Sequence, residues 1–230
     1  MNTDRKTART VGVLFIGTTV AGIISGAFLL PIVGAPDYLA QISANETQVM
    51  LGALFYFIMA AGCASIVIPM YPILKKYNRG MALGAVGFRL IEGAIFMVGV
   101  MCVLSLVTLS QEFVRAGTPD ASYFQTLGDL LLAGYTINHA VVPGVFAFSI
   151  GALMYYYIFY QSKLVPRWLS VWGLVGIILG IANGLYDMFA TPNVTIAMLL
   201  DLVIFAQEMV LGVWLIVKGF NSSAIASQAQ

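Results

Sequence analysis

The stretch MALGAVGFRLIEGAIFMVGVMCVLSLVTL, residues 81–109, is apolar for longer than the roughly 20 residues that a helix needs to cross the hydrocarbon core of a bilayer. It contains two ionisable residues, Arg89 and Glu92, which are three apart and therefore share one face of a helix. Charged side chains within a membrane span are rare, and they usually face the interior of a bundle. The stretch therefore predicts a membrane-spanning helix that borders a polar interior.

The composition of the whole chain agrees with a membrane protein. Of the 230 residues, 60% are hydrophobic and 9% are charged, whereas about a quarter of the residues in soluble domains are charged. The formal net charge is +1, and no basic run is long enough to follow a phosphate backbone, which argues against nucleic acid as a partner. Cys63 and Cys102 both lie in apolar runs, so neither a disulfide framework nor a cysteine-based zinc site is expected.

Six apolar runs have the length of membrane spans, and they predict an all-α, polytopic membrane protein built as a six-helix bundle. The fourth run is too long for one crossing and contains Pro143-Gly144, so it predicts either one kinked helix or two, with an amphipathic stretch before the span. We expect a transmembrane domain at 11–218 between tails at 1–10 and 219–230. The predicted runs are Val11–Val33, Val49–Leu74, Met81–Leu109, Thr126–Tyr160 (its span over about 141–160), Trp168–Met188 and Val194–Val217.

The basic residues are distributed unevenly over the connections between these runs. If successive runs alternate in direction, nine of the 11 lysines and arginines lie on one side, Arg115 lies on the other, and Arg89 lies inside a run. This asymmetry predicts that both termini are cytoplasmic. The nine residues are Arg5, Lys6, Arg9, Lys75, Lys76, Arg79, Lys163, Arg167 and Lys218.

An acidic residue in the last run is expected to lie near this pair. At 1.5 Å per residue, Arg89 and Glu92 lie roughly 12 and 16 Å from the cytoplasmic edge of their run, and Glu208 lies roughly 14 Å from the same edge. We expect Arg89 to lie between the two carboxylates, because an unpaired charge at this depth is costly. Two interpretations stay open: an ionic cluster that fixes the bundle, and a site that contacts a ligand.

A second polar group is expected nearer the opposite surface, as an outer pocket. Asn183 and Asp187 are four apart, and Asp201 precedes Glu208 by seven residues, so each pair shares a helix face. His139 lies at a compatible depth in the fourth run. A single histidine does not indicate a metal site, and no catalytic constellation or cofactor motif stands out.

Three stretches carry a family resemblance: Arg89-x-x-Glu92, the turn LVPRW at 164–168, and the closing run QEMVLGVWLIVKGFN at 207–221. Together they resemble a prokaryotic family of integral membrane proteins catalogued only as a domain of unknown function (number four-three-eight-six). The similarity extends from Val11 to Asn221. The resemblance implies a multi-span protein of bacterial or archaeal cytoplasmic membranes, and it gives weight to Arg89, Glu92 and Glu208 without indicating a substrate.

Two classes of function remain open. The first is a non-enzymatic bundle that binds or passes a small solute, a proton or a cation, or senses a lipid, because the acids in and beside the spans outnumber Arg89. A stabilising or immunity-type partner of another membrane protein would have a similar sequence. The second is an intramembrane hydrolase of the aspartyl or metal type. An aspartyl enzyme would use Asp187 and Asp201, although residues 199–201, Leu-Leu-Asp, lack the Gly-x-Gly-Asp run of intramembrane aspartyl proteases, and a zinc enzyme would need more than one histidine. The residues favour the first class.

Overall fold

The computed structural model describes residues 3–117, 121–135, 142–189 and 194–226. All regular secondary structure in these ranges is helical, and six of the helices are long and apolar enough to cross a membrane. The predicted all-α fold with six spans is therefore confirmed. The six helices are α1 (Thr3–Val33), α3 (Glu46–Ser65), α5 (Arg79–Ala116), α7 (Val142–Ser162), α8 (Arg167–Phe189) and α9 (Val194–Val217).

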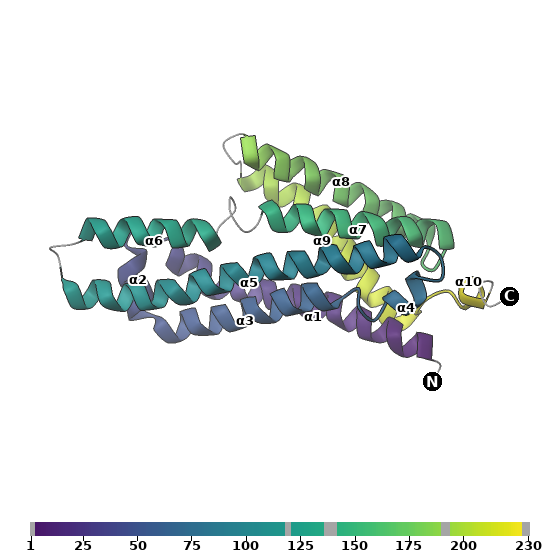
Figure 1. The fold of residues 1–230 in the computed structure, drawn as a ribbon, viewed down its shortest axis with the longest axis horizontal. Coiled ribbons are helices and arrows are strands. Elements are labelled where there is room, and N and C mark those ends of the chain that lie inside the picture. Colours follow the sequence, from purple (N-terminus) through teal and green to yellow (C-terminus); the bar gives the residue numbers. More distant parts are fainter. Residues whose placement is uncertain (1–2, 118–120, 136–141, 190–193, 227–230) are drawn as a thin grey trace.

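The six long helices form a closed ring. Helix α1 packs on α3, α3 on α5, α5 on α7, α7 on α8, and α8 on α9, which returns to α1. The start of α1 and the short helix α10 (Ser222–Ala226) lie at the same end of the bundle, which we call the terminal end; the opposite end is the distal end (Figure 1). Arg5 joins α1 to α9 at the terminal end, because its guanidinium donates to the carbonyl oxygens of Val217 and Lys218 at the C-terminal end of α9.

Small residues allow the first and last spans to approach closely. A Cβ atom added at Gly12 would lie 2.5 Å from the carbonyl oxygen of Gly212, so only glycine fits at this crossing of α1 and α9. The crossing of α3 and α5 is also close, since a Cβ at Gly93 would lie 2.9 Å from the carbonyl oxygen of Ala60. Small residues in spans thus serve packing within the ring, as lipid-embedded bundles require.

The second span is shorter than predicted. Helix α3 ends at Ser65, residues 66–70 form turns, and the short helix α4 (Tyr71–Leu74) follows. The prolines at 69 and 72 explain the early end, because each removes a backbone donor that a continuing helix would use. Hydropathy alone did not reveal this, since the residues beyond the break are also apolar.

The long fourth run forms two helices, α6 (Ala121–Tyr135) and α7, with the residues between them outside the described ranges. Pro143 lies in the first turn of α7, where a proline is tolerated, so it begins a helix and does not kink one. Helices α6 and α2 (Tyr38–Ala44) both pack on α5. Helix α5 has 38 residues and is roughly 57 Å long, which is well beyond a hydrocarbon core of about 30 Å.

Helices α2 and α6 are linked at the distal end (Figure 1). The hydroxyl of Tyr38 donates to Asp129 Oδ1 at 2.7 Å. Burial, together with this carboxylate, raises the pKa of Tyr38. The residues at 3–10 and 222–226, predicted as tails, contain the first turns of α1 and the short helix α10 (Ser222–Ala226).

Candidate functional site

The site begins with an ion pair on one face of α5, in the interior of the ring. Arg89 Nη1 lies 2.9 Å from Glu92 Oε2, and both side chains are buried. Their spacing of three residues brings them together on the same helix without help from another span. A pair removed from water in this way gains much less than its Coulomb energy, but breaking it leaves an uncompensated buried charge.

Two neighbouring helices complete the surroundings of the pair. On α7, the ring of Phe148 lies 5.0 Å from Arg89 Cζ, a cation–π contact. Gly151, one turn further along, lets α7 pack closely on α5, because a Cβ there would lie 3.2 Å from Phe88 Cβ and 3.3 Å from the carbonyl oxygen of Ala85. On α3, the buried thiol of Cys63 is close enough to interact electrostatically with Glu92.

Glu208 approaches this pair from α9 but does not join it. Its carboxylate interacts electrostatically with Arg89 and Glu92, yet within the described part of the chain Arg89 forms an ion pair with Glu92 alone. The expected arrangement of Arg89 between two bonded carboxylates is therefore only half present. The reason is the ring itself: α5 and α9 are not neighbours in it, so Glu208 faces the pair across the interior.

Three buried polar atoms around the pair have no hydrogen-bond partner in the described structure. They are Arg89 Nε, Tyr155 Oη and Glu208 Oε1, and they come from α5, α7 and α9. Arg89 interacts electrostatically with both other residues, so the three belong to one region. Native proteins pair nearly all buried polar atoms, and a group of unpaired ones indicates a place for water, an ion or a ligand.

A second set of contacts fixes the wall of this region, and it was not predicted. The hydroxyl of Tyr156 donates to Gln207 Oε1, and Gln207 Nε2 donates to the carbonyl oxygen of Leu169 at 3.0 Å. These bonds join α7, α9 and α8 beside Glu208. The available signal was a lone amide within an apolar run, because such a side chain must find partners when it is buried.

Three of the four residues predicted for the outer pocket lie together, and the fourth, His139, is outside the described residues. Asn183 Nδ2 donates to Asp201 Oδ1 at 3.4 Å, and Asp187 interacts electrostatically with Asp201. Asn183 Oδ1 and Asp187 Oδ1 are buried without a hydrogen-bond partner among the described residues. The two aspartates therefore lie near each other, and the unused buried acceptors belong to Asn183 and Asp187.

The outer group borders open space beside α8, and one of its members, Asp201, is exposed. Gly180 is itself buried, yet a Cβ added to it would meet no atom of the described residues within 4 Å. Asn183 and Asp187 follow it by three and seven residues, so all three share one face of α8. Asp201 and Glu208 likewise share a face of α9, roughly 10 Å apart along the helix. One face of α9 thus carries a polar group at each of two depths.

Nothing in the described part of the chain forms a metal site by residue type, because no three His, Cys, Asp or Glu side chains lie together there. The acceptors that are present belong to isolated carboxylates and amides. Such groups suit a proton, a weakly held cation or a hydrogen-bonding solute better than a tightly bound transition metal.

The six apolar helices around this interior define a multi-pass membrane protein. Residues 10–219 match the model of a family described as a domain of unknown function (DUF4386), and the chain belongs to that family. The resemblance seen in the sequence is therefore confirmed. No curated protein and no solved structure matches the chain.

Proposed function

We propose that this protein is non-enzymatic and binds a small cationic solute in the interior of its helix ring, in competition with protons. The observation that carries the proposal is the set of unpartnered atoms around Arg89, above all Glu208 Oε1. A carboxylate buried without a cationic partner is neutralised by a proton or by a bound cation.

The balance of charge supports a cation over an anion. Four acids lie in or beside the described interior, whereas Arg89 is the one buried basic residue among the described residues and is already paired with Glu92. An anionic solute would meet three carboxylates that form no ion pair among the described residues, Asp187, Asp201 and Glu208. A cationic solute, or protons, would offset them.

The position of the outer group supports an entrance from the distal end. Asn183, Asp187 and Asp201 lie nearer that end than Glu208 does, and Gly180 leaves space on the face of α8 that carries the first two. We infer that the solute first meets the outer group and then the Arg89 region.

The uneven distribution of basic residues supports an orientation with both termini in the cytoplasm of a prokaryotic cell. The start of α1 and helix α10 both lie at the terminal end, which agrees with an even number of crossings (Figure 1). The solute then enters from outside the cytoplasmic membrane.

The test uses the full chain in phosphatidylcholine nanodiscs. Native mass spectrometry looks for a retained small molecule, and thermal unfolding is followed with sodium, methylammonium or tetraethylammonium at pH 8 and pH 5. We expect at least one cation to raise Tm more at pH 8, because a ligand that binds the folded state stabilises it and protons compete for the same acids. Glu208→Gln should abolish the effect, and Glu112→Gln, at an exposed acid, should retain it. An unchanged response in Glu208→Gln would overturn the proposal.

A further inference from the structure

All three tryptophans of the chain lie in one cluster at the terminal end. Trp168 and Trp172, on α8, have ring centroids 6.3 Å apart, and Trp168 meets Trp214 of α9 at 6.5 Å. Tryptophan concentrates at the level of lipid headgroups, where its ring lies in an apolar environment and its N–H reaches water. The cluster therefore marks the headgroup level at this end of the bundle.

Beside the cluster, two turns of the chain line a pocket of about 640 Å³ that is open to the surface. Its volume is within the range of small-ligand sites. One turn follows α7 and the other follows α9, and each begins with a left-handed residue: Lys163 at φ 56° and Gly219 at φ 76°. The backbone N–H of Asn221 donates to the carbonyl oxygen of Leu164 at 2.8 Å and holds the turns together. The pocket is thus a built feature of the fold.

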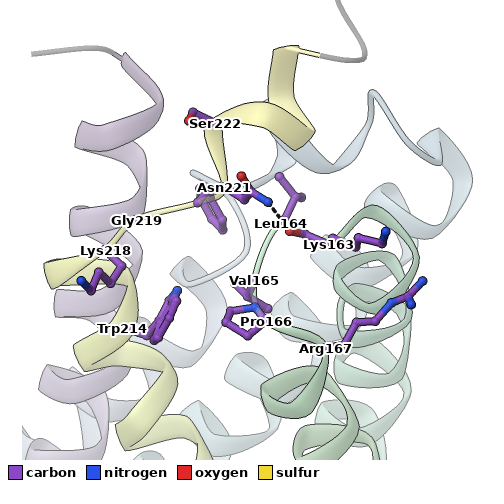
Figure 2. Close-up of a pocket in the computed structure, with 11 residues that line it drawn as sticks. Lys163, Leu164, Val165, Pro166, Arg167, Trp214, Lys218, Gly219, Asn221 and Ser222 are labelled. Atoms are coloured by element: carbon purple, nitrogen blue, oxygen red, sulfur yellow. Dashed lines mark hydrogen bonds between the residues drawn. The ribbon is translucent and has the colours of Figure 1, made fainter.

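Basic residues border the pocket on two sides. Figure 2 shows Lys163 and Arg167 on one side and Lys218 on the other, with Trp214 and Pro166 between them. The charged tips extend outward from the rim, as long basic side chains do at a membrane surface. None of the described residues that line the pocket is acidic, so the pocket favours an anion.

An apolar groove of about 390 Å³ adjoins the pocket along α9. Trp214 and Lys218 line both, so the groove and the pocket form one continuous surface. Among the other residues of the groove, Val210, Val213 and Val217 are exposed on the surface of the bundle. The groove is lined by Met209, Val210, Val213 and Val217 in addition to the two shared residues.

We propose that this surface binds an anionic phospholipid, with the headgroup phosphate at the pocket and an acyl chain in the groove. The basic rim supplies charge complementarity, the tryptophans fix the depth, and the groove continues from the pocket toward the hydrocarbon. Basic pockets between spans at the cytoplasmic side are a recurring form of headgroup recognition. The proposal is independent of the interior site, because it uses none of its residues.

The test compares lipids on the full chain in mild detergent. Native mass spectrometry and Tm are measured with phosphatidylglycerol, cardiolipin and phosphatidylcholine. We expect the two anionic lipids to bind and to raise Tm, and the zwitterionic lipid to do neither. The triple variant Lys163→Gln/Lys218→Gln/Arg167→Gln should bind phosphatidylglycerol on the order of 100-fold more weakly, since each basic residue near a surface contributes about fivefold.

The matched control removes the same charge from the other basic turn at this end, as Lys75→Gln/Lys76→Gln/Arg79→Gln, and should retain wild-type binding. Val213→Trp, which fills the groove, should weaken lipid binding without changing the response to inorganic phosphate. Equal loss in both triple variants, or equal binding of all three lipids by the wild type, overturns the proposal. Stabilisation by inorganic phosphate to the same extent as by phosphatidylglycerol also overturns it, in favour of a soluble anion.

Discussion

Helix α5 carries two ion pairs of the same spacing, three residues apart, which differ in the order of their residues along the helix and above all in their surroundings. Arg89 and Glu92 lie 2.9 Å apart with side chains 2% and 5% exposed, whereas Arg115 and Glu112 lie 2.7 Å apart with side chains 72% and 54% exposed. The distances would rank the exposed pair as slightly better. The surroundings reverse that ranking, because water screens the exposed pair and cannot replace either partner of the buried one.

The largest effect is expected from Arg89→Met. This change leaves Glu92 buried without a partner and should lower the free energy of unfolding by about 3–5 kcal/mol. Unfolding in mixed micelles and the yield of monodisperse protein measure the change. Arg115→Met is the control and should differ from the wild type by less than about 1 kcal/mol. A normally folded Arg89→Met variant that has lost only ligand binding would show that the pair is a binding group and not a structural one.

The next largest effect is the coupling within each pair, measured by double-mutant cycles. For the buried pair we expect Arg89→Met/Glu92→Leu to recover most of the stability that Arg89→Met loses, because removing both charges leaves no unpaired buried charge. The coupling should be several kcal/mol there and roughly 0.2–1 kcal/mol for Arg115 with Glu112. Equal coupling in the two cycles would mean that the interior of the ring is as wet as the distal surface.

Glu208→Gln should change stability less than either step above, by about 1 kcal/mol at most. The substitution breaks no ion pair, because Glu208 forms none in the described structure. Glu208 Oε1 also accepts no hydrogen bond there, so the glutamine amide at this position loses none. The same variant should lose its cation response, so its stability and its binding separate. A loss as large as that of Arg89→Met would place Glu208 in the same ionic unit as Glu92.

The smallest effect is expected from Glu112→Gln. Exposed pairs of this spacing contribute roughly 0.3–0.5 kcal/mol, and salt screens them. The difference from the wild type should therefore disappear at 1 M salt, whereas the effect of Arg89→Met should persist. Salt dependence of the Arg89→Met effect would indicate that ions reach the buried pair.

The sequence allowed the local features of this fold to be predicted, and the contacts between helices decided the rest. Hydropathy located the six spans, and the spacing of Arg89 and Glu92 predicted their contact, because both depend on one helix alone. The missing bond to Glu208 depended on which helices are neighbours in the ring, and no periodicity carries that information. The hydrogen bonds of Gln207 and the unused space at Gly180 have the same origin.

The close crossing of Gly12 and Gly212 has a consequence for how the protein is made. Helices α1 and α9 meet there, so the ring cannot close until α9 has been synthesised. Helix α5, with Arg89 and Glu92, precedes α7 and α9 in the chain, so these residues enter the membrane before all the helices that later surround them have been synthesised. Because both lie on α5, the arginine brings its own counter-charge into the bilayer. A partner on α9 would have arrived too late for this purpose.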